Sequence, residues 1–232
     1  MEPLLTEDYM KTDFYLIRWL MANDFDMSAA VNMLAKNLRW RRENKMSSIH
    51  LENFDDMKRD FPTSVDTNDR DGRPVGTLDV SQWNIRNAIV TGRSQRLLRY
   101  ICMLLENITN QVLVKNKNGA NVTQWDVVMN ADGMNMINHG CPSCIQVWMR
   151  FMYSLQNYYP GWMHEFIVID APFAVNLILD ATRPAVSRDI RENMKVFGTN
   201  RIQWMQYLDS KISRKERTEA FGGTKSTEMK KL

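Results

Sequence analysis

Cys141 and Cys144 form the sharpest chemical motif of the chain, with Pro142 and Ser143 between them. A C-x-x-C pair can act as a redox dithiol or supply half of a zinc site. A structural zinc would need two more ligands, and Cys102 is the only other cysteine. A thioredoxin-like site would also stand after a strand near the start of its domain. The sequence therefore favours a helix start with two small buried residues, and a thiol-dependent enzyme is the weaker alternative.

The histidines do not assemble into a catalytic or metal site. His164 and Glu165 begin like the helix of a zinc protease, but no second histidine follows four residues later, and the pair stands where a strand begins. His50 and His139 stand apart from that pair, and for all three histidines we expect loop or surface placement.

Loop motifs for nucleophiles, nucleotides and calcium are also missing. The sequence has no G-x-S-x-G elbow and no G-x-G-x-x-G turn, and GGTKS at 222–226 lacks the glycine spacing of a phosphate loop. The D-x-N-x-R pattern at 66–70 places Arg70 where a calcium loop requires an oxygen ligand. We therefore expect no catalytic residues, no metal and no cofactor, and we predict that the protein is not an enzyme.

The composition is typical of a soluble α/β domain. The 232 residues are 44% hydrophobic, which allows one sizeable core and a small helical appendage. No stretch approaches the ~18 apolar residues that span a bilayer, and the acidic start MEPLLTEDYMKTD is not a secretory signal. Three cysteines are too few for a disulfide framework, so we expect a cytoplasmic protein. The net charge of +3 does not indicate nucleic acid, but it is compatible with transient contact with an anionic membrane.

Methionine is unusually frequent, with 17 residues. Its flexible thioether fills irregular apolar space. This suits a cavity for a long or bent ligand, and it equally suits an ordinary core in which Met replaces Leu.

Residues 1–60 are predicted to form a small helical unit. Asp26 is a good N-cap, and Ala30, Leu34 and Leu38 recur behind it at helical spacing. The helix ends in the basic run RWRRENK, whose charges complement the helix dipole. Four basic residues here are candidates for contact with anionic membrane headgroups, or else form a solvated helix end: Arg39, Arg41, Arg42 and Lys45.

From about residue 61 the pattern changes to strands that alternate with helices. A DG turn at 71–72 leads into the run VGTLDV, and a long helix with one apolar stripe follows. Next come a β run at 124–131, a helix from about 142 to 158 and a β run at 165–169. This alternation predicts an α/β fold with a mainly parallel sheet and crossover helices over 61–224, followed by a frayed tail at 225–232.

Short motifs occur in a fixed order along most of the chain. NYYP, the strand FIVIDAP, an amphipathic helix that ends in RP, MKVFG and AFGGT lie between 157 and 224. Upstream are LIRWLMANDFDMSAAVNMLAKNLRWRRENK at 16–45, DRDGRPV at 69–75 and WDVVMNADG at 125–133. Together these motifs resemble the CRAL-TRIO family of lipid-binding and lipid-transfer proteins, and they follow that family's order.

The resemblance implies a hydrophobic ligand pocket that is closed by a gate helix. In the family, the helix after the FIVIDAP strand lies over the mouth of a deep pocket and swings outward at the membrane. Here that helix reads FAVNLILDAT, followed by the stop Arg183-Pro184. A helix that packs permanently on the sheet is the alternative. The resemblance implies a carrier that moves a hydrophobic small molecule or lipid between membranes, with no cofactor other than that bound ligand.

Three departures from one branch of the family bear on the ligand. The phosphatidylinositol-transfer branch holds the inositol phosphate with a Glu, a Thr and a Lys. The corresponding positions here are Gly161, Ile190 and Asn193. Without the Lys, a buried phosphate would lack a charge partner, which is costly. The departures favour a tocopherol, retinoid, squalene, sterol or carotenoid-like molecule, and they leave open a phospholipid held in another way.

Candidate pocket residues come from the two later β runs, the helix between them, the gate and the helix after it. Each of them could instead belong to the core, because strand side chains alternate between two faces and the pattern does not say which face is which. The candidates are Met129, Phe151, Met152, Leu155, Ile167, Ile169, Phe173, Leu177, Ile178, Ala181 and Ile190.

The main alternative to a carrier is a regulatory interaction module that binds phospholipid or phosphoinositide, because CRAL-TRIO domains also occur beside GTPase-regulating domains. A chain that ends at the GGT motif favours the carrier. We expect a lipid ligand and a transient membrane surface as partners, and no nucleic acid.

Overall fold

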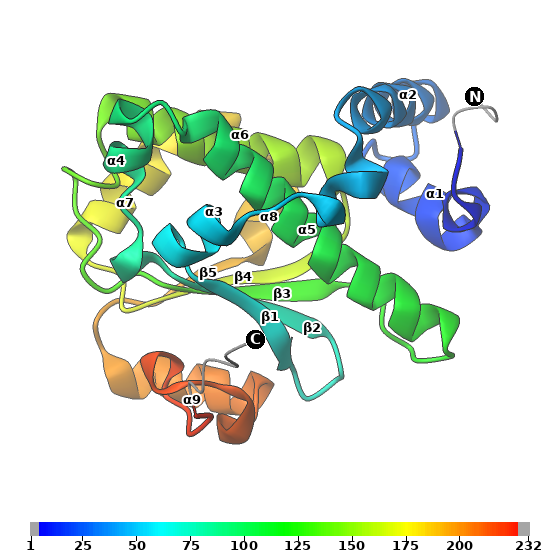
Figure 1. The fold of residues 1–232 in the computed structure, drawn as a ribbon. Helices are drawn as coiled ribbons and strands as arrows, with labels where there is room; N and C mark the ends of the chain where they lie inside the picture. The colour runs from blue at the N-terminus through cyan, green and yellow to red at the C-terminus, as the bar shows by residue number, and fades with distance from the viewer. Residues whose placement is uncertain (1–4, 227–232) are drawn as a thin grey trace.

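The computed structural model describes residues 5–226, and in them the chain forms a five-stranded sheet with helices on both faces (Figure 1). The strands lie in sequence order, and they are β1 (Thr63–Asn68), β2 (Pro74–Asp79), β3 (Trp125–Asn130), β4 (Met163–Ile169) and β5 (Met194–Val196). β1 and β2 form an antiparallel hairpin, and β2 through β5 are parallel. The predicted α/β fold with a mainly parallel sheet is confirmed.

Helices before the sheet form the N-terminal part of the molecule. They are the 3-10 helix η2 (Asp8–Lys11), α1 (Asp13–Met21), α2 (Met27–Glu43), the 3-10 helix η3 (Met46–Leu51) and α3 (Asp55–Asp60). The side chain of Asp26 accepts a hydrogen bond from the amide of Ala29 at 3.0 Å, so the predicted N-cap is confirmed. Within the predicted tail at 225–232, residues 227–232 lie outside the described residues.

Arg18 of α1 joins the helical unit to the sheet domain. Its guanidinium donates to the carbonyl oxygens of Gly161 at 2.5 Å and Thr123 at 2.6 Å. The ring of Trp162 lies 3.9 Å from the guanidinium carbon, and the ring of Phe14 lies 4.4 Å from it. Burial lowers the pKa of Arg18 to about 10, because the charge has lost most of its water. The two carbonyls and the aromatic faces replace part of that hydration, and Nε of Arg18 is buried without a hydrogen-bond partner.

One face of the sheet is covered by α4 (Ile85–Val90), α5 (Ser94–Lys117), α6 (Pro142–Tyr158), α7 (Phe173–Thr182) and α8 (Arg188–Asn193). Two 3-10 turns, η4 (Val80–Gln82) and η5 (Arg183–Ala185), connect these elements. The apolar stripe of α5 is buried at Leu97, Ile101, Leu105, Ile108 and Val112. This face and the N-terminal helices share one large hydrophobic core.

The other face of the sheet carries α9 (Arg201–Lys211) and the 3-10 turns η6 (Arg214–Glu216) and η7 (Glu219–Phe221). A second, separate core fills this side, and it consists of Val75, Val128, Ile167, Ile169, Trp204, Leu208, Ile212 and Phe221. The AFGGT motif closes it. A Cβ atom on Gly223 would lie 2.0 Å from the carbonyl oxygen of Arg217, so only glycine fits there.

Asp209 and two arginines hold the chain that follows α9. Asp209 accepts a hydrogen bond from Arg214 at 2.6 Å and also pairs with the buried Arg217. The hydrogen bonds from Arg214, together with those from Arg217, lower the pKa of Asp209 from 3.8 to about 2. Because the folded state binds this proton less tightly than the unfolded state, the stabilisation is fully present above about pH 4 and is lost as the pH falls toward about 2.

We therefore expect Asp209→Asn to flatten the acid limb of the stability curve. The free energy of unfolding, measured with urea between about pH 6 and pH 2, should fall less steeply for the variant than for the unmodified protein. Parallel curves for the two proteins would show that this carboxylate does not contribute to the acid sensitivity.

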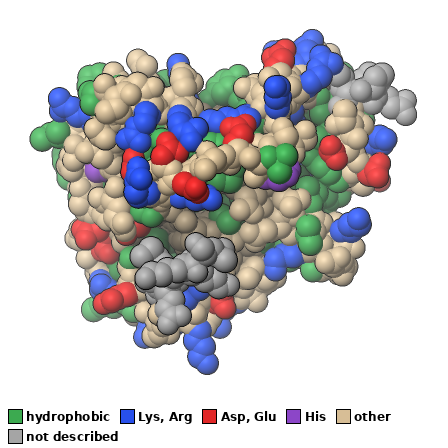
Figure 2. Space-filling model, in the orientation of Figure 1, with side chains coloured by type: hydrophobic (Ala, Val, Ile, Leu, Met, Phe, Trp, Pro, Cys, Tyr) green, Lys and Arg blue, Asp and Glu red, His purple; other side chains and the backbone are tan. Residues whose placement is uncertain are grey.

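Ion pairs on the surface connect α3 and η3 to α5. Arg93 pairs with Asp60, Arg96 with Asp56 and Arg99 with Glu52. Figure 2 shows basic and acidic side chains interleaved over this part of the molecule. Pairs as exposed as these contribute little to stability. Among residues 5–226, no helix is both long and apolar enough to pass through a bilayer.

Candidate functional site

A small cavity lies between the sheet, α6 and α7. Its volume is about 20 Å³, and it is lined by Met129, Met134, Trp148, Met152, Phe166, Val168, Val175, Ile178, Leu179 and Thr182. A space of this size holds about one water molecule. The structure is therefore closed around the predicted pocket, and a larger ligand fits only if the elements around it move apart.

Several of the candidate pocket residues meet at this cavity. Met129 of β3, Met152 of α6 and Ile178 of α7 line it directly. Phe151, Leu155 and Ile190 are buried in the same core without lining the cavity. These six residues come from four different elements, and the fold brings them to one side of the sheet.

Ile167 and Ile169 lie on the opposite side, which corrects their assignment to the same pocket. Both belong to the second core, under α9. Their neighbours Phe166 and Val168 line the cavity instead. A parallel strand that is buried on both faces is hydrophobic at every position, so alternation in the sequence cannot show which side chains face the ligand.

The helix α7 turns a different face inward from the predicted one. Phe173 is 73% exposed and Leu177 is 40% exposed, and Ala181 is exposed as well. Val175, Ile178, Leu179 and Thr182 face the cavity. The helix therefore carries apolar side chains on both sides, and Asn176 and Asp180 are also exposed on the outer side. Of the predicted stripe, only Ile178 covers the cavity.

Exposed apolar side chains also occur on the segments next to α7. Met136 and Ile137 are exposed in the loop after β3, and Met134 of that loop lines the cavity beside α7. Val90, at the end of α4, is 71% exposed. The amide of Arg86 in α4 donates to the carbonyl of Asn138 at 3.0 Å, so α4 adjoins the loop.

The backbone changes direction at both ends of α7. Asp170, just before the helix, has a φ of +49°, which is uncommon for a residue other than glycine. Its carboxylate accepts a hydrogen bond from the indole of Trp204 at 2.9 Å, which anchors this point to α9. At the other end the helix passes into η5, which contains Pro184. A short helix is thus held between two places where the backbone direction changes.

Arg41 is not free for the predicted membrane contact. Its guanidinium donates to both carboxylate oxygens of Glu106 in α5, at 2.7 and 2.8 Å, and the hydroxyl of Tyr159 donates to the same carboxylate at 2.7 Å. Burial opposes the charge of Arg41, but the hydrogen bonds to Glu106 outweigh it and raise the pKa of Arg41. The other three basic candidates, Arg39, Arg42 and Lys45, are exposed.

A larger cleft, of about 1070 Å³, lies between the helical unit and the outer side of α5 and β1. Charged side chains line it, among them Arg42, Lys45 and Glu52, and so do apolar ones, among them Met10, Met103 and Leu104. The lining of this cleft is therefore mixed, whereas that of the small cavity is almost entirely apolar. The sequence does not predict this cleft, because it is lined by residues that are far apart along the chain and share no sequence motif.

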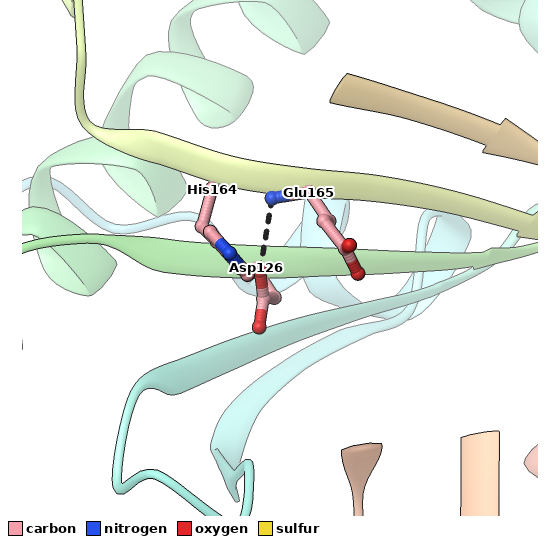
Figure 3. A group of neighbouring side chains, drawn as sticks. All are labelled: Asp126, His164 and Glu165. Carbon is pink, nitrogen blue, oxygen red and sulfur yellow. Dashed lines mark hydrogen bonds and ion pairs between the residues drawn. The ribbon is translucent and has the colours of Figure 1, made fainter. Parts of the chain in front are cut away.

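Asp126, His164 and Glu165 lie close together on β3 and β4 (Figure 3). The carboxylate of Asp126 accepts hydrogen bonds from Nδ1 of His164 and from the amide of Glu165, both at 2.9 Å. Glu165 accepts from the hydroxyl of Tyr207 at 2.8 Å and from the ammonium of Lys211 at 3.1 Å. Glu165 is thus paired with the positive charge of Lys211, and Asp126 is held by His164 and a backbone amide.

The three histidines differ in their placement. His50 is exposed in η3, and His139 lies in the loop before α6, as expected. His139 is nevertheless buried, and its ring contacts the amide of Asn135 and the carbonyl of Val80, both at 3.2 Å. His164 lies near the start of β4 rather than in a loop, and its side chain is 29% exposed.

Comparison with known proteins supports the same fold. The chain is 23% identical over 219 residues to the CRAL-TRIO domain-containing protein T23G5.2 of Caenorhabditis elegans, a match that covers 93% of this chain and 30% of that protein. It is 23% identical over 197 residues to Protein real-time of Anopheles gambiae, covering 83% of this chain and 29% of that protein. The chain thus spans about three-tenths of the length of these curated relatives.

A solved structure and a family model complete the comparison. The crystal structure of Sfh5 superimposes with a TM-score of 0.74 at 18% identity, covering 92% of this chain and 74% of that one, which shows a shared fold. The family described as CRAL/TRIO domain matches residues 58–223, which is most of the chain. This chain therefore belongs to the CRAL/TRIO domain family, whose members bind and transfer lipophilic ligands.

Proposed function

We propose that this protein is a non-enzymatic carrier that holds a neutral hydrophobic molecule under α7 and exchanges it with a membrane when α7 opens. The observation that carries the proposal is the two-sided apolar character of α7, which closes an apolar cavity and exposes Phe173 and Leu177. Thr182 is the one polar side chain among the described residues of the lining, and its hydroxyl donates to the carbonyl of Leu179 at 3.1 Å. Such a lining suits a tocopherol, retinoid, squalene, sterol or carotenoid-like ligand.

The energies of the two states of α7 support membrane-triggered opening. Opening in water exposes Val175 and Ile178, at about 1.5–3 kcal/mol for each side chain, or about 3–6 kcal/mol in total. On a bilayer the uncovered Val175 and Ile178 meet lipid instead of water, which removes most of this cost, whereas Phe173 and Leu177 are already exposed in the closed state and anchor the helix to the surface. The closed state thus predominates in solution, and the open state becomes accessible at the membrane. We infer a cytoplasmic protein that associates transiently with membranes.

A lipid-sensing module is the second candidate function. The relatives are about three times as long as the matched stretch, so the same fold occurs within larger proteins. In that setting, ligand occupancy under α7 would act as a signal to another part of a protein. The ligand would occupy the same site in both functions. In a sensor, however, the opening of α7 would transmit a signal and would not deliver the ligand to a membrane.

The site can be tested with photoactivatable lipids of neutral and phospholipid types. The purified protein is first extracted with organic solvent and analysed by native mass spectrometry, which identifies co-purifying lipids. It is then loaded with a matched photoactivatable lipid, illuminated and digested. We expect cross-links on α6 and α7, at peptides that contain Met152 and Ile178. Cross-links confined to α2 and the outer side of α5 would assign the ligand to the larger cleft and overturn the proposal.

We expect little preference for phosphatidylinositol over phosphatidylcholine in vesicle transfer. Gly161 adopts a φ of +68°, where a Glu would be strained, and its carbonyl is held by Arg18. Ile190 is buried among apolar side chains, and the amide of Asn193 donates to Asp189 at 3.2 Å. The two transfer rates should agree within about threefold, which corresponds to roughly 0.7 kcal/mol. Efficient and selective transfer of phosphatidylinositol would show that other residues hold its headgroup.

A further inference from the structure

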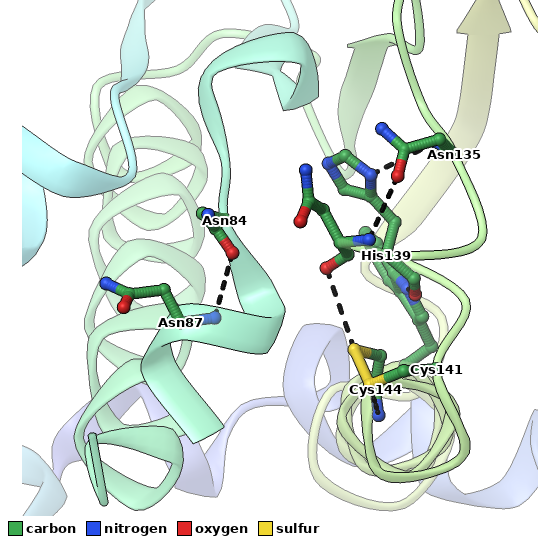
Figure 4. Close-up of a disulfide and its surroundings, with 8 residues drawn as sticks. Asn84, Asn87, Asn135, His139, Cys141 and Cys144 are labelled. Atoms are coloured by element: carbon green, nitrogen blue, oxygen red, sulfur yellow. Dashed lines mark hydrogen bonds between the residues drawn. A yellow bond between two sulfur atoms is a disulfide. The ribbon is translucent and has the colours of Figure 1, made fainter. Parts of the chain in front are cut away.

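Cys141 and Cys144 are joined by a disulfide at the start of α6 (Figure 4). The expected helix start is present, but Cys141 is only partly buried and the two sulfurs are bonded to each other. We propose that the pair is a reversible dithiol–disulfide site in which Cys141 is the sulfur that exchanges with external thiols. The proposal does not depend on the carrier function.

The two cysteine residues differ in their exposure to solvent. Cys144 is fully buried, whereas Cys141 is partly exposed. Thiol–disulfide exchange requires an attacking thiolate to reach one sulfur and the other sulfur to leave. In this geometry an external thiol can reach Cys141, and Cys144 is the shielded partner that reforms the bond.

The position of Cys141 favours its thiolate. It is the N-cap of the 17-residue helix α6, and its sulfur accepts a hydrogen bond from the amide of Cys144 at 3.2 Å. The positive end of a helix stabilises a nearby anion, and cysteines at helix N-termini have lowered pKa values. Pro142 occupies the first turn, where it pre-organises this geometry.

The third cysteine provides an internal comparison. Cys102 lies on α5, and burial raises the pKa of its thiol to about 11. It is therefore almost entirely protonated near neutral pH and reacts slowly. The structure thus disfavours the thiolate form of Cys102, whereas the helix N-terminus favours that of Cys141.

The exchange balances with a small-molecule thiol RSH, such as glutathione, as the reductant. The thiolate RS⁻ attacks the sulfur of Cys141, the Cys141–Cys144 bond breaks, and Cys144 leaves as a thiolate that takes up a proton. A second RS⁻ attacks the sulfur of the bound R group, which releases RSSR and the thiolate of Cys141. In total, two thiols are oxidised to one disulfide, and the protein disulfide is reduced to two thiols.

The test is a thiol count on the folded, full chain. The protein is equilibrated near pH 7 with mixtures of reduced and oxidised glutathione, quenched with an alkylating agent and weighed by mass spectrometry. We expect Cys141 and Cys144 to change from disulfide to two alkylated thiols while circular dichroism shows a folded protein. A pair that is reduced only in denaturant, or that never forms a disulfide in oxidised glutathione, overturns the proposal.

Single variants identify the exchanging sulfur. Of the pair, Cys144→Ser keeps only Cys141 and should form a mixed disulfide with glutathione at that position at least about tenfold faster than Cys141→Ser does at the buried Cys144. Cys102→Ser serves as the control and should leave the exchange unchanged. Equal rates for the first two variants contradict the assignment. If either variant fails to fold, peptide mapping of the reduced unmodified protein gives the same comparison, because Cys141 should be alkylated at least about tenfold faster than the buried Cys144.

Discussion

Replacing Leu177 with Arg is expected to lower lipid transfer between vesicles at least about tenfold, while the free energy of unfolding changes by no more than about 0.5 kcal/mol. Leu177 is 40% exposed on the outer side of α7, so the closed fold tolerates a longer, charged side chain there. In the open state the same side chain meets lipid, where an Arg costs up to about 2.5–3.5 kcal/mol at the bilayer centre. About 1.4 kcal/mol of that cost is enough for a tenfold effect.

Asn176→Arg is the matched control for this experiment. Asn176 is the exposed polar neighbour on the same helix, so the variant adds an identical charge without removing an apolar contact. Its transfer rate should stay close to that of the unmodified protein. Transfer is followed with a fluorescent lipid, and stability is measured by urea unfolding. An unchanged transfer rate in a folded Leu177→Arg protein would remove α7 from the exchange mechanism.

Removing the carboxylate of Glu106 is expected to cost about 3–5 kcal/mol of the free energy of unfolding, because it leaves the buried guanidinium of Arg41 without its partner. The side chains of Arg41 and Glu106 are only 15% and 19% exposed. Tyr159, which is buried, also loses its acceptor. The free energy of unfolding of a small domain is about 5–15 kcal/mol in total. The contact between α2 and α5 should therefore contribute a large share of the stability of this protein.

The surface pair of Arg99 and Glu52 provides the comparison. It connects η3 to the same helix α5 and is more exposed, so Glu52→Ala should cost no more than about 1 kcal/mol. Combining Glu106→Leu with Arg41→Met should recover part of the stability, because no charge is then left buried. If Glu106→Ala and Glu52→Ala lower the free energy of unfolding equally in urea, the buried pair contributes no more to stability than the surface pair.

The parts of the fold that follow local rules could be predicted from the sequence. Asp26 caps its helix through its own side chain, and the stripe on α5 repeats at the helical period. The alternation of β runs and long helices required a parallel sheet, because two parallel strands need a crossover between them. Each of these inferences uses residues that are neighbours along the chain or that share one helix.

The candidate site depended on contacts that local patterns do not contain. Ile167 and Phe166 are equally hydrophobic, and only the packing of α9 on one face decides which of them meets the cavity. Likewise α7 carries apolar side chains on both its inner and its outer side, with Asn176 and Asp180 among the outer ones, so its inward face could not be chosen from its period. Arg41 finds its partner in a different unit of the structure, and a basic helix end in the sequence gave no sign of it.

The sheet divides the hydrophobic interior into two cores that share no residue. α7 belongs to the core above the sheet, whereas α9 and the AFGGT segment close the core below it. A displacement of α7 therefore breaks contacts on one side only, and the lower core continues to hold β2, β3 and β4 in register. Amides under α9 should consequently keep their hydrogen-exchange protection while those around α7 exchange rapidly on vesicles. Ligand exchange through α7 and the stability of the fold therefore depend on opposite faces of the same sheet.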